Sequence, residues 1–538
     1  MSAEDDEEFL KSCYINTGTS DKLSSIGNPE CIALGRTGSG KSAALIHISG
    51  KQNNVRSIEP ESLSLNYISN STVIKYLEDI GIDLGIFYQL LWRHVLVVEL
   101  LKMKKEFNDA RNQQSWLTSL FGFTRDNPKR KAALEYLTSF GDSFWLDTEL
   151  RIREIVNRIE TKIEDEIGGK ITDLLPGFPL SIEGKTRSSS DEERTAFTEV
   201  VNKAQRAVNS VQLQQLNEVI SFLSDDVFDD KKQSYYLVID NLDEGWVHDN
   251  LRFKLIRALI ETIKKFRKIR NVKIVISLRA DLLETVLENT TASGFQTEKF
   301  EDLMVRMNWS DEELRELVDL RLNRLFQDQY TQKTVGCIDV FPGRIGDVDA
   351  FTYMLHRSMR RPRDLIAYIN ECLAISNSGK SIGTKSLRQA EASFSRRRVR
   401  ALADEWRGAY GDLEVPFRIL SKLESRFEFR DVTDDLLEEL CIQIVAGDET
   451  TKGRFARECE IISKGDADYR RLRRTFFETM YVVGAVGYRR LAGTPMEWSF
   501  INEPILTYAA LQPETPFAIH PMLHKEFGMR GDAKSFFT

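Results

Sequence analysis

Short apolar runs recur along the chain and predict a sheet of buried strands. They lie at 31–34, 55–58 (a possible second strand, apolar only at Val55 and Ile58), 235–239, 272–276 and 303–307. Each run has the length of a buried strand, and most of its residues favour β-structure. Between the third and fourth runs, apolar residues recur at helical spacing from about 249 to 267, which predicts a connecting helix. Strands alternating with helices predict an α/β fold.

Helical patterns dominate the region between the second and third strands. The apolar stretch 86–101 is interrupted by polar residues and predicts a buried amphipathic helix, not a membrane span. Two long helices are expected near 145–167 and 191–223, and the polar segment 176–190 is expected to be mobile. This insertion is interpreted either as an arm for a partner or for self-assembly, or as a helical subdomain packed on the core. Its isoleucine stripes favour the second interpretation.

The C-terminal part predicts two further modules. Ser310 and Glu313 form a capping-box pattern that begins a helix directly after the last strand. Helices are expected near 416–424, 433–445 and 468–482, followed by a hairpin of 485–488 and 498–501. This order predicts a winged-helix-like module. The predicted domains are therefore a discontinuous core (1–60 and 228–308), a helical insertion (61–227), a helical lid (309–380) and a C-terminal helical, winged-helix-like domain (381–538).

Composition narrows the class of protein. A chain of 538 residues exceeds the size that one hydrophobic core usually serves. Its net charge of −8 argues against nucleic-acid binding by the whole surface, although a local basic face is compatible with it. The acidic N-terminus is unlike a secretory signal, and no membrane span is expected, so we predict a cytoplasmic protein. The six cysteines are scattered without a C-x-x-C pair, which supports neither a zinc site nor a disulfide framework.

The segment after the first strand carries the strongest chemical signal. It fits the phosphate-binding pattern G-x-x-x-x-G-K-[ST], between a buried strand and an apolar helix. Glycines let backbone N–H groups surround phosphates at the positive end of the helix. Lys41 is expected to reach the β- and γ-phosphates, and the Ser42 hydroxyl to ligate Mg²⁺. The alternative is a glycine-rich turn without a ligand. The predicted nucleotide-binding residues are Gly35, Arg36, Thr37, Gly38, Ser39, Gly40, Lys41, Ser42 and Ala43.

The third strand ends in acidic residues that suit a metal and a water. Asp240 follows the strand directly and is expected to hold Mg²⁺ through water. Glu244 is the first candidate for the base that polarises the attacking water, and Asp243 is the second. The alternative for each of these two is that it caps the next helix.

The tip of the fourth strand offers a sensor of the γ-phosphate. Ser277 and Arg279 follow its apolar run, and either could read the nucleotide. The alternative is that Arg279 forms an ion pair with Asp281 or Glu284.

These motifs together resemble a known group of ATPases. The segment Asp240 to Glu244, D-N-L-D-E, is similar to the D-G-h-D-E signature of NACHT and related STAND ATPases and to the acidic pattern of KAP ATPases, within the AAA+ group. The resemblance implies a P-loop NTPase with a three-layer α/β core, ATP and Mg²⁺ as ligands, and a lid that carries an arginine beside proline. Arg363, in Arg360 to Ile366, matches that arginine. Asn241 stands where efficient members carry glutamate, so hydrolysis is expected to be slow or activated by a partner.

The function that follows is an ATP-driven switch. Such bacterial proteins act in signalling and anti-phage defence, and the chain has no effector motif of its own, so a protein partner or self-association is expected. The alternative is a DNA-binding AAA+ ATPase that uses basic clusters on its winged helix. A third interpretation is a module that holds nucleotide and scarcely hydrolyses it. The basic clusters also fit a salt-bridged, solvated face; they comprise Arg396, Arg397, Arg398, Arg400, Arg470, Arg471, Arg473, Arg474, Arg489 and Arg490.

Overall fold

The chain groups by its contacts into two units. The computed structural model describes residues 7–63, 83–104, 213–230, 232–290, 298–329, 333–376, 382–446, 453–465, 468–491, 493–502 and 506–529, with single positions 78, 131, 157, 161, 164 and 165. One unit, here called the sheet unit, contains residues 18–35 and 41–306. The other, the helical unit, contains residues 1–17, 36–40 and 307–538. This grouping is coarser than the four predicted domains, which stay a prediction.

The sheet unit is built on a parallel five-stranded sheet with the order β2-β3-β4-β1-β5. All five strands predicted from the sequence are confirmed, with small shifts at their ends. The fourth strand continues through Ser277 and ends at Arg279, so both residues lie within it and not after it. The strands are β1 (Ile32–Gly35), β2 (Val55–Ile58), β3 (Tyr235–Ile239), β4 (Val272–Arg279) and β5 (Met304–Arg306).

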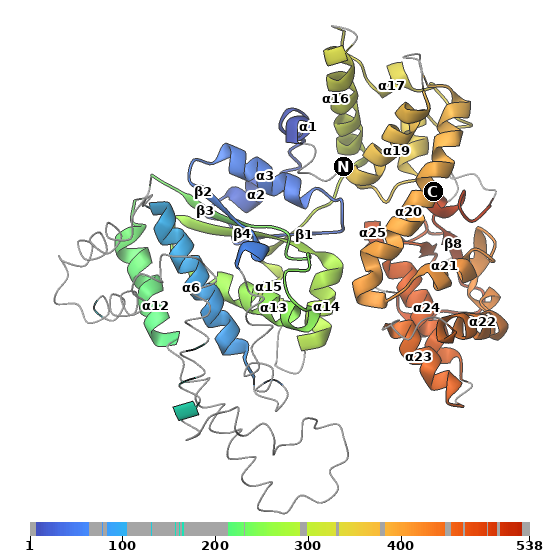
Figure 1. Ribbon diagram of the computed structural model, residues 1–538. Helices are drawn as coiled ribbons and strands as arrows, with labels where there is room; N and C mark the ends of the chain where they lie inside the picture. The colour runs from blue at the N-terminus through green and yellow to red at the C-terminus, as the bar shows by residue number, and fades with distance from the viewer. Residues whose placement is uncertain are drawn as a thin grey trace, which may run out of the picture. The chain divides into compact units, whose positions relative to one another are not determined.

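Helices cover both faces of this sheet (Figure 1). One face carries α2 (Thr19–Ser24) and α3 (Lys41–Lys51). The other carries α6 (Gly85–Lys104) and α13 (Asp249–Phe266). Burial of alternate residues of β3, such as Leu237 and Ile239, against α6 and α13 explains this layering. The predictions of a buried helix at 86–101 and of a helix at 249–267 are confirmed.

The remaining elements of the sheet unit are short. They are η1 (Pro60–Leu63), α12 (Leu213–Phe222), the π-helical turn η4 (Leu223–Val227), α14 (Ala280–Thr290) and α15 (Glu298–Glu301). The predicted helix at 145–167 and the polar segment 176–190 lie outside the described residues, apart from single positions. In the described part of the chain, no helix is long and apolar enough to cross a membrane.

The helical unit begins with a short helix and a bundle. These helices are α1 (Glu7–Ser12), α16 (Asp311–Gln329), α17 (Cys337–Val340), α18 (Ala350–Leu355), α19 (Pro362–Ile375) and α20 (Thr384–Tyr410). The predicted capping box of α16 is confirmed, because the Glu313 amide donates to Ser310 Oγ at 3.2 Å and the Ser310 amide donates to Glu313 Oε2 at 2.8 Å.

The last part of the chain combines helices with a small antiparallel sheet of order β6-β8-β7. Its strands are β6 (Arg426–Glu428), β7 (Val486–Tyr488) and β8 (Pro516–Ile519). The helices predicted at 433–445 and 468–482 are confirmed. The one predicted at 416–424 ends earlier, and the helix at 454–463 was not predicted. These elements are α21 (Glu414–Leu420), η6 (Phe429–Asp431), α22 (Asp434–Val445), α23 (Arg454–Ser463), α24 (Arg470–Val482), α25 (Ser499–Asn502), η7 (Tyr508–Ala510) and η8 (Pro521–Leu523).

The predicted hairpin of 485–488 and 498–501 is wrong in its second strand. Tyr488 forms only an isolated bridge with Glu497, and the chain then turns into α25. The reason is packing, because the buried Trp498 covers Gly487, where an added Cβ would lie 2.7 Å from the indole. β7 pairs instead with β8, far along the sequence.

Candidate functional site

The predicted acidic residue after β3 lies at the carboxyl edge of the parallel sheet. Ile239 is in register with Ile276 of the neighbouring β4, and Gly35 of β1 is in register with Arg279 on the other side of that strand. Ser277 Oγ donates a hydrogen bond to Asp240 Oδ1, and the Asn241 amide donates to the same oxygen at 2.9 Å. The Asp240 carboxylate is therefore held in one orientation at this edge.

Lys41 brings a positive charge toward the same edge of the sheet. It is the first residue of α3, and its Nζ donates to the Gly35 carbonyl at 3.1 Å. Burial lowers the pKa of Lys41 from its usual value, and the negative charges of Asp243 and Asp240 oppose this shift. The ammonium thus shares its surroundings with the predicted acidic residues, and Ser42 follows it in the first turn of the helix.

Arg279 forms the ion pair that was the alternative to a sensor. Its guanidinium donates to Asp281 through Nε at 3.0 Å and through Nη2 at 2.6 Å. Its Nη1 lies 3.4 Å from Asp243 Oδ2. Arg279 therefore bridges two carboxylates and stays close to the acidic edge, and the sensor role stays a prediction.

The loop after Asp240 presents the two candidate bases. Asn241 has a left-handed φ of 57°, which asparagine tolerates better than most residues, and it turns the chain directly after the strand. Arg252 Nη1 then donates to the Glu244 carbonyl at 2.9 Å and to the Asp243 carbonyl at 3.3 Å. Glu244 is exposed.

The alternative that Asp243 or Glu244 caps the next helix is wrong. The residue before the first turn of α13 is His248, which makes no side-chain capping bond. The chain between the acidic residues and the helix therefore forms a loop, and neither carboxylate caps α13.

Residues 36–40 of the predicted phosphate loop group with the helical unit. Gly38 and Gly40 have left-handed φ values of 78° and 96°, which explains the glycines. The Arg363 amide donates to the Gly38 carbonyl at 3.3 Å, and Trp309 Nε1 donates to the Ser39 carbonyl at 2.7 Å. Two carbonyls of the loop thus accept hydrogen bonds, one from a backbone amide in the first turn of α19 and one from the indole of Trp309 just before α16.

Arg361 is a residue of this site that the sequence did not single out. It is 2% exposed, and its Nη1 donates to the Thr37 carbonyl at 2.7 Å. Its charge is balanced by Asp364 at 2.7 Å and Glu405 at 2.9 Å. Burial opposes the charged guanidinium, but these two carboxylates raise the pKa of Arg361 above its usual value.

Asp364 is the centre of this buried network. It is fully buried, and Arg398 Nη2 approaches its second oxygen at 3.2 Å. Burial alone would raise the pKa of Asp364, but Arg361 and Arg398 outweigh it and lower the pKa to about 2. The spacing of Arg361 and Asp364, three residues apart at a helix start, could have suggested this pair. Nothing local could have identified Glu405.

Arg36 connects the loop to the small C-terminal sheet region. Its Nη2 donates to the Val483 carbonyl at 2.6 Å, directly after α24. Its guanidinium lies 5.5 Å from the centre of the Trp406 ring. Arg36 was predicted only as a position of the phosphate loop, and the structure adds these contacts.

The C-terminal basic clusters are largely ion-paired. Arg470 lies 2.7 Å from Asp468, and Arg474 lies 2.7 Å from Glu478. Arg473 pairs with Asp434 at 2.6 Å. These contacts support the salt-bridged face that was the alternative to a DNA-binding surface.

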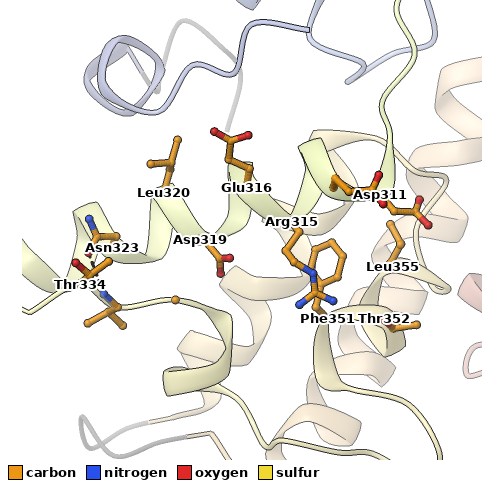
Figure 2. Close-up of a pocket in the computed structure, with 13 residues that line it drawn as sticks. Asp311, Arg315, Glu316, Asp319, Leu320, Asn323, Thr334, Phe351, Thr352 and Leu355 are labelled. Carbon is orange, nitrogen blue, oxygen red and sulfur yellow. Dashed lines mark hydrogen bonds between the residues drawn. The ribbon is translucent and has the colours of Figure 1, made fainter.

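A separate cavity of about 560 Å³ lies along α16 and contains no residue predicted from the sequence (Figure 2). Figure 2 shows Arg315 pointing toward Phe351, and the guanidinium lies 4.2 Å from the centre of that ring. Arg315 also pairs with Asp349 at 3.0 Å, and Asp319 accepts the Cys337 amide at 2.6 Å. Two of the charged groups that line the cavity, Arg315 and Asp319, therefore already have partners within the protein.

Comparison with known proteins gives one match. Residues 312–403, from α16 to most of α20, match a family model described as a FunZ-associated C-terminal helical domain. No curated protein and no solved structure matches the chain. The matched region contains Arg361 and Arg363, which contact the phosphate-loop residues, and almost all of the cavity lining.

Proposed function

We propose that this chain binds ATP with Mg²⁺ and hydrolyses it slowly, as a switch. The observation that carries the proposal is that the start of α3, with Lys41, and Asp240 both follow neighbouring strands at the carboxyl edge of one parallel sheet. A lysine at the start of a helix after a glycine-rich loop, facing a carboxylate after a buried strand, suits a nucleotide phosphate and its metal.

The residues present fit such a ligand. The positive φ values of Gly38 and Gly40 allow the loop to direct its amides toward an anion, and Ser39 Oγ is buried without a hydrogen-bond partner among the described residues. Lys41 would hold the phosphates, and Ser42 and Asp240 would hold Mg²⁺. The bound nucleotide supplies the phosphoanhydride bond that is cleaved. Ser277 orients Asp240, and Glu244 or Asp243 orients the attacking water.

The strand order supports a P-loop NTPase fold of the AAA+ or STAND type. β4 lies between β1, the strand before the predicted phosphate loop, and β3, the strand before Asp240, as in P-loop NTPases that carry an extra strand between these two. Asn241 follows Asp240 with a left-handed backbone, and the nearest glutamate lies three residues further on. This displacement favours slow hydrolysis or activation by a partner.

The contacts of the loop support a regulatory role. Arg361 and the Arg363 amide contact it from the start of α19, and Arg36 reaches from it to Val483. A change in the loop on ligand binding would therefore be transmitted to α19, α20 and the end of α24. We infer that a partner effector reads this change in a bacterial signalling or defence system. DNA binding by the C-terminal arginines is less well supported, because most of those with described contacts are ion-paired.

The test is nucleotide binding by a Lys41→Ala variant. We expect at least a hundredfold weaker binding of a fluorescent ATP analogue and no phosphate release above background. Lys51→Ala, an exposed lysine in the same helix that pairs with Asp21, is the matched control and should bind normally. Unchanged binding by Lys41→Ala would refute the proposal.

A further inference from the structure

The end of α13 and the turn after it carry a dense row of exposed cations in the sheet unit. Lys264, Lys265, Arg267, Lys268 and Arg270 are all exposed. No aspartate or glutamate occurs in the sequence between Glu261 and Asp281. We call these five residues the basic turn. It was not among the basic clusters noted in the sequence.

Buried apolar residues fix the outward direction of the basic turn. Ile263, Phe266 and Ile269 alternate with the cations and are at most 2% exposed. The turn is closed by the Ile269 amide, which donates to the Phe266 carbonyl at 2.9 Å, and by the Val272 amide, which donates to the Ile269 carbonyl at 3.2 Å. The core therefore anchors one side of the segment and leaves its cations in solvent.

The cations of the basic turn are not neutralised by the described part of the protein. None of the five forms an ion pair with a described residue, in contrast to Arg470 and Arg474 of the C-terminal region. The partial negative charge at the carboxyl end of α13 explains why cations such as Lys264 and Lys265 stand in its last turn. It does not account for Arg267, Lys268 and Arg270, which lie beyond the last helical turn.

A cavity of about 340 Å³ adjoins the basic turn and adds a further cation. It is lined by Arg267, Arg270 and Lys273, together with the loop before β1. Lys273 is 6% exposed, and its ammonium donates to the Ser25 and Asn28 carbonyls at 2.7 and 2.8 Å. Glu30 is the acidic neighbour that acts on Lys273, so positive charge remains in excess.

We propose that the basic turn binds the sugar-phosphate backbone of a nucleic acid, without reading its sequence. A row of unpaired Lys and Arg side chains suits a regular series of phosphates. The one aromatic residue of the segment, Phe266, is buried, so no described side chain of the turn can stack on an exposed base. This favours a duplex, in which the phosphates are exposed and the bases are covered.

The experiment measures binding of the full chain to a fluorescein-labelled 24-base-pair DNA duplex of mixed sequence by anisotropy. The same measurement with an RNA duplex and with single strands of the same sequence shows which kind of nucleic acid supplies the phosphates. If four phosphates are neutralised, log K should fall with log salt with a slope of about −3.6. Between 50 and 200 mM salt, Kd should then rise roughly 100-fold.

The variant K265Q/R267Q/K268Q/R270Q should raise Kd at 50 mM salt at least tenfold and flatten the salt slope. The control R407Q/K422Q/R430Q/K464Q removes four exposed cations that are already ion-paired, and it should bind within twofold of the parent. If the quadruple variant melts differently from the parent, the smaller variant K268Q/R270Q replaces it. Lys41→Ala should bind normally, which separates this surface from the nucleotide site.

The proposal would be overturned by no binding at 50 mM salt, by unchanged affinity in the basic-turn variant, or by an equal loss in the control. Preferential binding of poly-glutamate, lost in the basic-turn variant, would assign the surface to an acidic protein instead.

Discussion

Gly38→Ala is the substitution that most directly tests the contact between α19 and residues 36–40, the predicted phosphate loop. Gly38 has a φ of 78°, and an added Cβ would lie 2.5 Å from Arg363 Cβ and 2.9 Å from its Cδ. Arg363 Cβ is fixed by the first turn of α19 and cannot swing away as a side-chain end could. Gly346 is the matched control, because its φ is 61° and nothing lies within 4 Å of its added Cβ.

Two costs add up at Gly38. A left-handed backbone costs a non-glycine residue about 1–2 kcal/mol. Overpacking against a fixed neighbour costs about 1–3 kcal/mol more. The expected loss of stability is therefore about 2–5 kcal/mol for Gly38→Ala and about 1–2 kcal/mol for Gly346→Ala, which carries only the backbone cost.

Thermal unfolding followed by tryptophan fluorescence measures this difference, since Trp309, Trp406 and Trp498 all report on the helical unit. For a unit of this size, 1 kcal/mol corresponds to about 2–4 °C, so the Tm of Gly38→Ala should fall several degrees further than that of Gly346→Ala. Adding Arg363→Gly removes the opposing Cβ, and the double variant should recover about 1 kcal/mol or more relative to the sum of the single effects. Equal Tm values for the two alanine variants, with additive double-variant effects, would refute the contact.

Three further predictions concern the buried network and the candidate base. Arg361→Met leaves the buried Asp364 with one charged partner and should destabilise the helical unit by about 3–5 kcal/mol. The control Arg397→Gln, on the exposed face of α20, should change the Tm little, and comparable losses of Tm in the two variants would contradict the network. The pKa of Asp364 is about 2 in the folded protein and about 4 in the unfolded chain, so its contribution of roughly 2 kcal/mol to stability is present above pH 4 and is lost as the pH falls toward 2. When stability is measured against pH, that of Asp364→Asn should therefore decline less steeply in acid than that of the parent. Glu244→Gln should lower phosphate release at least tenfold with unchanged nucleotide binding, and if Asp243→Asn alone does so, the base is Asp243.

The three central strands β1, β3 and β4 could be predicted from the sequence because each is a short apolar run that is buried on both faces. Such runs are distinct from the helical patterns around them, and the P-loop pattern then fixes which strand comes first. The small C-terminal sheet was harder to predict from the sequence. β6 and β8 are short, and β8 pairs with strands far from it in sequence, so the hairpin signal near Gly487 pointed to the wrong partner.

The residues of the candidate site likewise fall into those that nearby sequence could predict and those that depend on contacts between distant segments. Local patterns predicted Lys41 and Asp240, and the resemblance predicted Arg363, whereas Arg361 depends on Glu405, which is brought close only by the packing of α19 on α20. The two arginines consequently differ in role. Arg361 has its charge satisfied inside the helical unit and positions the loop through Thr37. Arg363 contacts the loop through its backbone and Cβ, and its exposed side chain has no hydrogen-bond partner among the described residues. The residue chosen by resemblance thus contacts the loop through its backbone, and its buried neighbour holds the loop through a side-chain hydrogen bond.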